Sequence, residues 1–577
     1  MDCVQPHATD TALAAPDNVP PAEAAAPATG GPAPSPRFPA GPRWVCDPAA
    51  AFTRAALTAR LLGTRFSWRT TPVGLRLWFW LGPALAAVLA GVLRFVRLGQ
   101  PTSLVFDETY YVKDAYSYLQ SGYERNWAEK ANELFNQGIF TGLEGTAEYV
   151  VHPPVGKWMI AFGMWLFGAD STFGWRFTAA LVGTLSVFIL ALIAQKMFRS
   201  TTLGVLAGLL YAVDGHAIVQ SRTSLLDIFV MFFALLGFGA VLMDRDDGRR
   251  RLAARLSALA GADGRVPGRD LLYGPWLGIR WWRLAAGIAL GLCIGTKWSG
   301  LFFLAAFGLM SVLWDMSARR IAGIRHWVVA AVWKDGLLAF VSMVPVAAAT
   351  YLASWSGWFL SKDAYDRNWA AENPAGAWGW VPDSLRSLWH YHSTALNFHT
   401  GLSSDHPYKA NAWSWLVMGR PTSYYVENYE NGDGGCGVDK CTAAITSLGN
   451  PLIWWAGTLA LLFLVGVWIT QRDWRAGAIL CGFAAGFVPW LFYPERTIFF
   501  FYAIAYEPFM ILAVVLVLGM VLGRPGDPPW RKQQGALFAG LFVVLAVALS
   551  AYFYPLWSAE IITQDYWRQH MWLPSWI

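Results

Sequence analysis

Two adjacent carboxylates, Asp107 and Glu108, stand in the segment LVFDETYYVKDAYSYL, about ten residues after the first strongly apolar run of the chain. A carboxylate at the edge of a membrane is less costly than one at its centre. Partial burial there also raises the pKa of a carboxyl group and strengthens the carboxylate as a base. Taken alone, an acidic pair at the start of a loop is more often a solvated helix cap than a catalytic pair. The neighbouring motifs are therefore needed to choose between these two interpretations.

Cationic side chains stand beside several other apolar runs. Lys157 begins a Trp-bearing apolar segment after two prolines, Lys297 lies in IGTKWSGLFF, and Arg496 lies in WLFYPERTIFFFY. A single cation in such a place is an ordinary snorkelling side chain. Several cations at one depth instead favour an anionic head group, such as a lipid-linked phosphate.

The segment YAVDGHAIVQSRTSLLDIF adds four ionisable residues at the ends of apolar runs: Asp214, His216, Arg222 and Asp227. Ionisable residues at membrane depth are rare and usually functional. A structural ion pair, for example Asp214 with Arg222, explains them equally well. Both interpretations stay open at this point.

These residue types suit the transfer of a sugar from a lipid phosphate. The phosphate is already a good leaving group, so it needs cations to hold its charge and no general acid. The acceptor hydroxyl is a poor nucleophile and needs a base within hydrogen-bond reach. We therefore predict a single displacement with inversion and Asp107 as the base, while Glu108 shares the catalysis or orients the base or the acceptor. No motif demands a metal or another cofactor, although the acidic pair is able to recruit a divalent cation.

The composition indicates what kind of protein positions these residues. Of the 577 residues, 55% are hydrophobic and 14% are charged, whereas soluble domains carry about 25% charged residues. The 33 Trp residues are typical of membrane interfaces. Basic residues gather in short loops between apolar runs, so the net charge of +6 is no sign of a nucleic-acid partner. We predict an all-α, multi-pass membrane protein.

About eleven apolar runs are long enough to cross a hydrocarbon core of roughly 30 Å. They lie near residues 77–96, 175–197, 202–218, 225–243, 281–296, 300–314, 336–354, 452–470, 476–492, 498–522 and 535–555. Residues 1–70 are rich in Ala and Pro without an apolar period, which predicts a disordered tail. The membrane domain is then 71–577.

Loop charge predicts the orientation of these spans. The segment 244–283 carries nine Arg against five Asp, and the other Arg-rich loops fall on the same side of the membrane. That side is cytoplasmic by the positive-inside rule, and so is the tail. Two long loops, 98–174 and 355–450, then lie outside the plasma membrane, together with Asp107. In that setting Cys436 and Cys441 are expected to form a disulfide, with two free thiols as the alternative.

Five motifs in order resemble the protein O-mannosyltransferase family in its actinobacterial form. They are FDETYY (106–111), HPPVGK (152–157), FGWRF with Arg176, DGHAIVQSRTSLLDIF (214–229) and GTKWSGLF (295–302). The resemblance covers roughly residues 75–560. It implies a type C glycosyltransferase fold that moves mannose from polyprenyl-phosphate mannose to Ser or Thr hydroxyls of exported proteins. The partners that it implies are membrane lipid and, as a further expectation, the secretion machinery.

The resemblance also implies roles for individual residues. Asp107 and Glu108 become the catalytic pair. The predicted donor-phosphate and substrate contacts are Lys157, Arg176, Asp214, Arg222, Lys297 and Arg496. The chain departs from the eukaryotic members in the loop 355–450, which is too short for their soluble insert, so the selection of acceptor peptides stays open. That loop carries His390, His392, His399 and His406, for which acceptor or sugar contacts are expected over a metal.

Two alternatives remain. A related enzyme with the same base and cations would use a glycolipid or a cell-wall glycan as acceptor. A transporter of polyprenyl-phosphate sugars would carry ionisable residues deep inside several spans and often paired repeats. Here the ionisable residues lie at the outer edge and no internal repeat is evident, which favours the enzyme.

Overall fold

The computed structural model describes residues 52–63, 73–261, 263–524 and 526–577. The predicted disordered tail therefore lies largely outside the described residues. Within it, Arg54–Leu62 form helix α1, so the prediction of disorder is wrong for this stretch. Leu57 and Leu61, one turn apart, are buried against α9, and this small apolar stripe is what holds the helix in place.

The described residues contain eight helical segments long and apolar enough to cross a membrane. These are α2 (Val73–Phe95), α6 (Thr172–Phe198), α9 (Asp227–Leu259), α12 (Gly300–Ile321), Trp327–Ser354 with α14 (Leu337–Ser354), α19 (Pro451–Gln471), Trp474–Phe492 with α20 (Trp474–Phe487), and α22 (Pro529–Trp557). Helices α7 (Thr201–Val213) and α8 (Gly215–Arg222) meet at a 61° bend, the geometry of a broken span or of a re-entrant loop. The fold is a helical membrane bundle, as predicted.

All eleven predicted runs fall on apolar helices, but α11 (Trp281–Ile294) and α21 (Glu507–Leu522) are short and belong to no longer candidate span among the described residues. Helix α11 has 14 residues and α21 has 16. A straight crossing needs about 20 residues. The number of complete crossings therefore stays a prediction, while the positions of the runs are confirmed.

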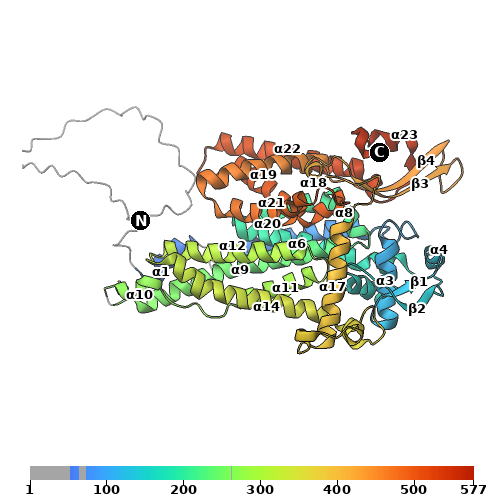
Figure 1. Cartoon of the computed structure of the whole chain (residues 1–577). Coiled ribbons are helices and arrows are strands. Elements are labelled where there is room, and N and C mark those ends of the chain that lie inside the picture. The colour runs from blue at the N-terminus through green and yellow to red at the C-terminus, as the bar shows by residue number, and fades with distance from the viewer. Residues whose placement is uncertain (1–51, 64–72, 262, 525) are drawn as a thin grey trace, which may run out of the picture. The chain divides into compact units, whose positions relative to one another are not determined.

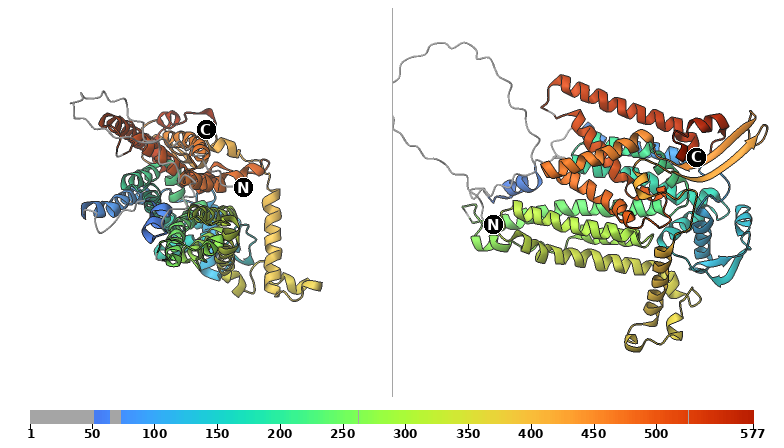
Figure 2. Two further views of the ribbon diagram at one scale, coloured as in Figure 1. Left: turned by 90° about the vertical axis from the view of Figure 1, so that its left-hand side faces the viewer. Right: turned by 45° about the horizontal axis from the view of Figure 1, so that its top comes forward.

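The two long loops lie at the same end of the bundle (Figures 1 and 2). The first carries α3 (Glu108–Ser121), β1 (Arg125–Trp127), α4 (Ala131–Asn136), β2 (Leu143–Ala147) and α5 (Val155–Phe167). The second carries α15 (Ser356–Leu360), α16 (Trp369–Glu372), α17 (Asp383–Gly401), α18 (Ala412–Trp415), β3 (Thr422–Glu430) and β4 (Lys440–Ser447). They contact each other directly: the Tyr391 hydroxyl accepts from the N–H of Val150 at 3.1 Å and donates to its carbonyl at 2.7 Å.

Two small antiparallel sheets complete the loops, and sequence analysis did not predict them. Strands β1 and β2 pair with each other, and β4 lies between β3 and the short β5 (Ile562–Thr563). The predicted Cys436–Cys441 disulfide is confirmed and closes the end of the β3–β4 hairpin.

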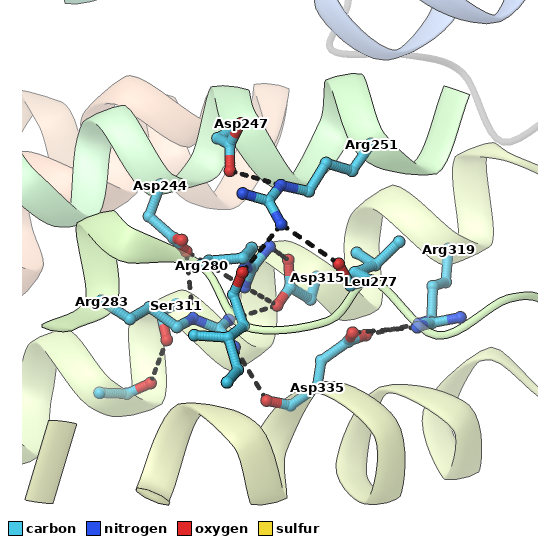
Figure 3. Close-up of polar contacts among 12 residues, drawn as sticks. Asp244, Asp247, Arg251, Leu277, Arg280, Arg283, Ser311, Asp315, Arg319 and Asp335 are labelled. Carbon is cyan, nitrogen blue, oxygen red and sulfur yellow. Dashed lines mark hydrogen bonds and ion pairs between the residues drawn. The ribbon is translucent and has the colours of Figure 1, made fainter. Parts of the chain in front are cut away.

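The opposite end of the bundle is held by buried ion pairs (Figure 3). Asp244 stands 17 residues after the start of α9, so it lies about 25 Å along the helix from Asp227. Arg280 and Arg283, at the start of α11, both bind Asp244 at 3.1 Å. Both also bind Asp315 of α12. The pairs tie three helices together.

A second pair extends this network to the segment that precedes α14. Arg319 of α12 binds Asp335, which lies in the π-helical stretch η1 (Ala331–Gly336). Arg283 also donates to the Asp335 carbonyl at 2.9 Å. Gly248 of α9 leaves room for this arrangement, because a Cβ there would meet the Arg280 guanidinium at 1.8 Å.

We expect Asp315→Ala to lower the free energy of unfolding by about 3–5 kcal/mol, because it removes a buried carboxylate shared by two guanidinium groups. The matched control is Asp247→Ala, which removes a partly exposed pair with Arg251 and should cost less than about 1 kcal/mol. Thermal unfolding of the purified protein in detergent measures both. Equal losses in the two variants would contradict a role for the buried network.

Candidate functional site

The site forms where α3 begins, and a single carboxylate fixes that start. Glu108 is fully buried. Its Oε1 accepts from Arg176 Nε at 2.8 Å and from the N–H of Ser224 at 2.9 Å. Its Oε2 accepts from Arg176 Nη2 at 2.8 Å and from the N–H of Val105 at 3.0 Å. Four donors therefore satisfy one carboxylate.

Arg176 connects this carboxylate to the segment that leaves the first span. It lies near the start of α6 and also donates to the carbonyls of Pro101 and Ser103, each at 2.9 Å. All three of its nitrogens are thus bonded to protein groups. Arg176 and Glu108 together hold the backbone just before α3, where Phe106 takes a positive φ of 46°.

Asp107 has a different environment from its neighbour. It occupies the position before the first residue of α3, and its side chain makes no capping hydrogen bond. Burial raises the pKa of Asp107 to about 6; the nearby Lys297 acts to lower it and Asp227 acts to raise it. Lys297 itself donates to Asp227 at 2.7 Å. Asp107 is therefore a carboxylate of increased basicity beside a paired lysine.

A cavity of about 240 Å³ has Lys297 and Asp227, the two charged groups that act on Asp107, in its wall, whereas Asp107 itself is not part of that wall. Its wall includes His152, Asp227, Lys297, Trp298, His399 and Arg496. Lys297 Nζ also lies 5.2 Å from the ring centre of Tyr502, and the Arg496 guanidinium lies 5.5 Å from that of Trp490. The cavity thus combines two cations with aromatic walls.

Arg496 keeps unused donor capacity in this cavity. Its Nε donates to the carbonyl of His399 at 3.0 Å, and its Nη2 lies 3.3 Å from the ring Nδ1 of the same residue. Its Nη1 is buried and finds no partner among the described residues. A buried guanidinium nitrogen without an acceptor favours an anionic ligand at this position.

The two histidines of the cavity are held in the neutral form. His399 Nε2 lies 2.9 Å from the Val151 carbonyl, which leaves its Nδ1 to accept from Arg496. Burial is the largest cause that lowers the pKa of His399, and burial and Lys297 lower the pKa of His152 well below its ordinary value. Neutral imidazoles leave the positive charge of the cavity to the lysine and the arginine.

The four histidines predicted to contact substrate do not gather in one place. His399 lines the cavity. His392 lines a second, more apolar cavity of about 970 Å³, and His390 stacks on Trp369. His406 packs edge-on against Phe499 near Phe106. No group of three His, Cys, Asp or Glu side chains in the described part of the chain is arranged to hold a metal ion.

Lys157, predicted as a phosphate contact, is bonded within the protein. It is buried, donates to Glu124, and lies 3.8 Å from Asp114 of α3. Burial raises the pKa of Asp114 to about 8, with Lys157 acting to lower it and Glu124 to raise it. Lys157 therefore joins α5 to α3 and stands outside the cavity wall that contains Lys297.

Asp214 and Arg222 also have structural partners, but they do not pair with each other. Asp214 accepts from the N–H of His216 at 2.9 Å, which caps α8, and from the N–H of Asn450 at 3.0 Å. Arg222 donates to carbonyls at the end of α2, including those of Arg94 at 3.0 Å and Val96 at 2.7 Å. Their partners give no support to direct substrate contacts, which stay a prediction.

Some residues of the cavity were not among the predicted site residues. Asp227 and Trp298 appear in the sequence only as members of motifs, and Tyr502 lies in an apolar run. The signal available for Asp227 was a carboxylate at the start of a long apolar helix, which is rarely tolerated without a partner. Nothing in the sequence assigns Lys297 as that partner, because 70 residues separate them.

Comparisons with known proteins agree with this architecture. A family model described as dolichyl-phosphate-mannose-protein mannosyltransferase matches residues 84–262. A model described as the C-terminal four TMM region of protein-O-mannosyltransferase matches residues 384–576.

Relatives of similar length are found in actinobacteria. A polyprenol-phosphate-mannose–protein mannosyltransferase of Mycolicibacterium smegmatis is 37% identical over 510 residues, which cover 86% of this chain and 93% of the relative. One of Corynebacterium glutamicum is 34% identical over 506 residues, with coverages of 85% and 92%. A solved structure, the S. cerevisiae protein O-mannosyltransferase Pmt1-Pmt2 complex bound to the sugar donor, aligns with a TM-score of 0.63 at 16% identity, over 92% of this chain and 95% of the other, and supports the fold.

We expect the two neighbouring carboxylates to respond differently to amidation. Glu108→Gln should lower the free energy of unfolding by about 3–5 kcal/mol, because its amide nitrogen would face N–H donors and Arg176 would lose its counter-charge. Asp107→Asn should not lower it, because Asp107 gives no capping bond. Thermal unfolding in detergent compares the two, and a destabilised Asp107→Asn beside an unaffected Glu108→Gln would reverse the assignment.

Proposed function

The chain belongs to the protein O-mannosyltransferase family, and we propose that Asp107 is the base with which it transfers mannose from polyprenyl-phosphate mannose to Ser or Thr hydroxyls of proteins. The activity is that of a glycosyltransferase. The observation that carries the role of Asp107 is its environment: a carboxylate of raised pKa, free of capping bonds, on which the charges of Lys297 and Asp227 in the cavity wall act.

The reaction is a single displacement at the anomeric carbon. Asp107 takes the proton of the acceptor hydroxyl as the oxygen forms its bond to that carbon. The bond from the anomeric carbon to the phosphate oxygen breaks, and its electron pair leaves with the polyprenyl phosphate. Lys297 and Arg496 hold the resulting charge, which fits the unpartnered Nη1 of Arg496. Attack from the side opposite the leaving group inverts the anomeric configuration.

The other predicted site residues are better explained as positioning groups. Glu108 and Arg176 use their polar atoms on each other and on backbone groups, so they fix Asp107 without meeting the substrate. Lys157, Asp214 and Arg222 likewise join elements of the protein around the site. This proposal narrows the catalytic pair of the sequence-based prediction to one reacting carboxylate.

We place the site on the outer face of the plasma membrane. The Arg-rich ends of α9 and α12 stand at the end of the bundle away from Asp107, and the positive-inside rule favours that end as cytoplasmic. Polypeptides that have been exported are then the acceptors, and the polyprenyl chain of the donor stays in the membrane. An association with the secretion machinery stays a prediction.

We expect membranes with the wild-type protein to transfer label from polyprenyl-phosphate mannose to a Ser/Thr-rich peptide. Asp107→Asn should reduce transfer by about 10²–10⁴-fold, the usual contribution of a general base. Label released from the peptide by β-elimination identifies an O-linked sugar. Undiminished transfer by a folded Asp107→Asn removes Asp107 as the base, and label found only in lipid or glycan favours the other acceptor class.

The pH dependence of transfer should report the ionisation of Asp107. Only the deprotonated carboxylate accepts a proton, so kcat/KM should fall about tenfold per pH unit below a pKa of about 6 and level off above it. The inflection should persist in Asp114→Asn, which removes the other carboxyl of raised pKa in the same helix. A rate that is constant between pH 5 and pH 8 contradicts this assignment.

A further inference from the structure

Strand β3 presents an unpaired edge beside the site. The three-stranded sheet has the order β3-β4-β5, so β4 is bonded on both sides and β3 on one side only. Strand β4 is buried almost along its whole length, and it packs on α22 and α8. Along β3, the side chains from Val426 to Asn428 and that of Glu430 are exposed. The other edge of β3 pairs with no strand among the described residues.

The start of β3 touches the residue next to Asp107. The Tyr424 ring stacks on the Phe106 ring at 4.8 Å between centres, with 7° between the planes. The register of β3 on β4 shifts between Ser423 and Tyr425, which places Tyr424 in a bulge. A bulge of this kind re-aims a side chain. It turns Tyr424 inward, where the side chain is 5% exposed and its hydroxyl accepts from Gln220.

The remainder of β3 leads away from the site as a supported strand. From Tyr424 to Glu430 it covers about 20 Å. Figure 1 shows the β3–β4 hairpin extending from the end of the bundle that carries α3, and the Cys436–Cys441 disulfide closes its far end. Natural proteins rarely leave a long strand edge unpaired, because such an edge recruits another strand.

We propose that the acceptor polypeptide binds in extended form as an added strand on the free edge of β3, so that its Ser or Thr reaches Asp107 at the Tyr424 end. This inference rests on the proposed function, since it names how the acceptor of that site is held. The occupant follows from continuity: the strand begins near Tyr424, whose ring stacks on Phe106, the residue before the proposed base, and it runs outward from there. Backbone hydrogen bonds supply the affinity, and they make the recognition largely independent of acceptor side chains.

The proposal predicts a periodic effect of backbone methylation in the acceptor. Alternate residues of a paired strand direct their N–H toward the neighbouring strand. N-methylation at every second residue on one side of the acceptor Thr should raise KM about two- to tenfold per position, from loss of one hydrogen bond each. The residues between them, and those on the other side of the Thr, should tolerate methylation. The donor is polyprenyl-phosphate mannose, and synthetic peptides with a single Thr are the probes.

The outcomes separate the two proposals. No transfer to the unmethylated peptide defeats the proposed function itself. If transfer occurs but KM does not alternate between successive N-methylated positions, the strand binding mode is overturned while the proposed function stands. The same follows if methylation raises KM equally on both sides of the Thr. A dimer in detergent whose formation blocks long peptides would assign the edge to a second copy of the chain and also overturn it.

Two variants of the protein test the same edge. Neighbouring strand residues direct their N–H to opposite sides, so of Val426→Pro and Glu427→Pro one removes a donor from the free edge and the other a bond to β4. The variant that removes a donor from the free edge should transfer mannose to a short Thr peptide at the wild-type rate. It should no longer show a lower KM for a long peptide than for a short one. If both variants keep the full preference for the long peptide, the edge does not bind it; if both fail to fold, the methylated peptides decide.

Discussion

The ion pair between Glu108 and Arg176 is the interaction on which the site depends. It brings together the start of α3, the start of α6 and the residues before α9, because the same carboxylate also accepts from the N–H of Ser224. Four donors on one buried carboxylate compensate its charge, whereas a buried carboxylate that loses its partner is strongly destabilising. The neighbouring Asp107 receives no such compensation. Their surroundings therefore give the two adjacent acids different roles: Glu108 is bonded to protein donors, and Asp107 stays available to a substrate.

The cations also divide into those bonded within the protein and those that line the cavity. Arg176 is bonded at all three nitrogens to the Glu108 carboxylate and to carbonyl groups, and Arg222 donates through Nη1 and Nη2 to carbonyls that the end of α2 leaves open. Lys297 and Arg496 instead stand in the cavity wall, and the arginine retains a buried nitrogen without an acceptor in the described residues. Cations whose donors are used by protein groups stabilise the fold around the site. Cations in the cavity wall keep donors that are available to a phosphate.

Hydropathy was sufficient to predict the helical bundle, because each apolar run must be helical to satisfy its backbone in a membrane. The disulfide followed from two cysteines in one long polar loop. Partnerships were beyond the sequence: 68 residues separate Arg176 from Glu108, and 33 separate Lys157 from Glu124. Residue type alone marked these side chains as unusual but did not show whether they meet the substrate or each other. The patterns of α1, β1, β2 and β5 are too short to distinguish from loop, whereas β3 and β4 span nine and eight residues and were missed inside a segment interpreted as a polar loop.

Aromatic side chains gather around Phe106 and Lys297, next to Asp107 in the sequence and in the structure respectively. The ring centre of Phe501 lies 5.5 Å from that of Phe106 and 5.9 Å from that of Tyr424. Lys297 Nζ lies 5.8 Å from the ring centre of Phe501. These rings reduce the water around the carboxylate, which is the physical cause of its raised pKa. Water is also the nucleophile that would compete with a protein hydroxyl for the sugar. The burial that raises the pKa of Asp107 therefore also limits the access of competing water.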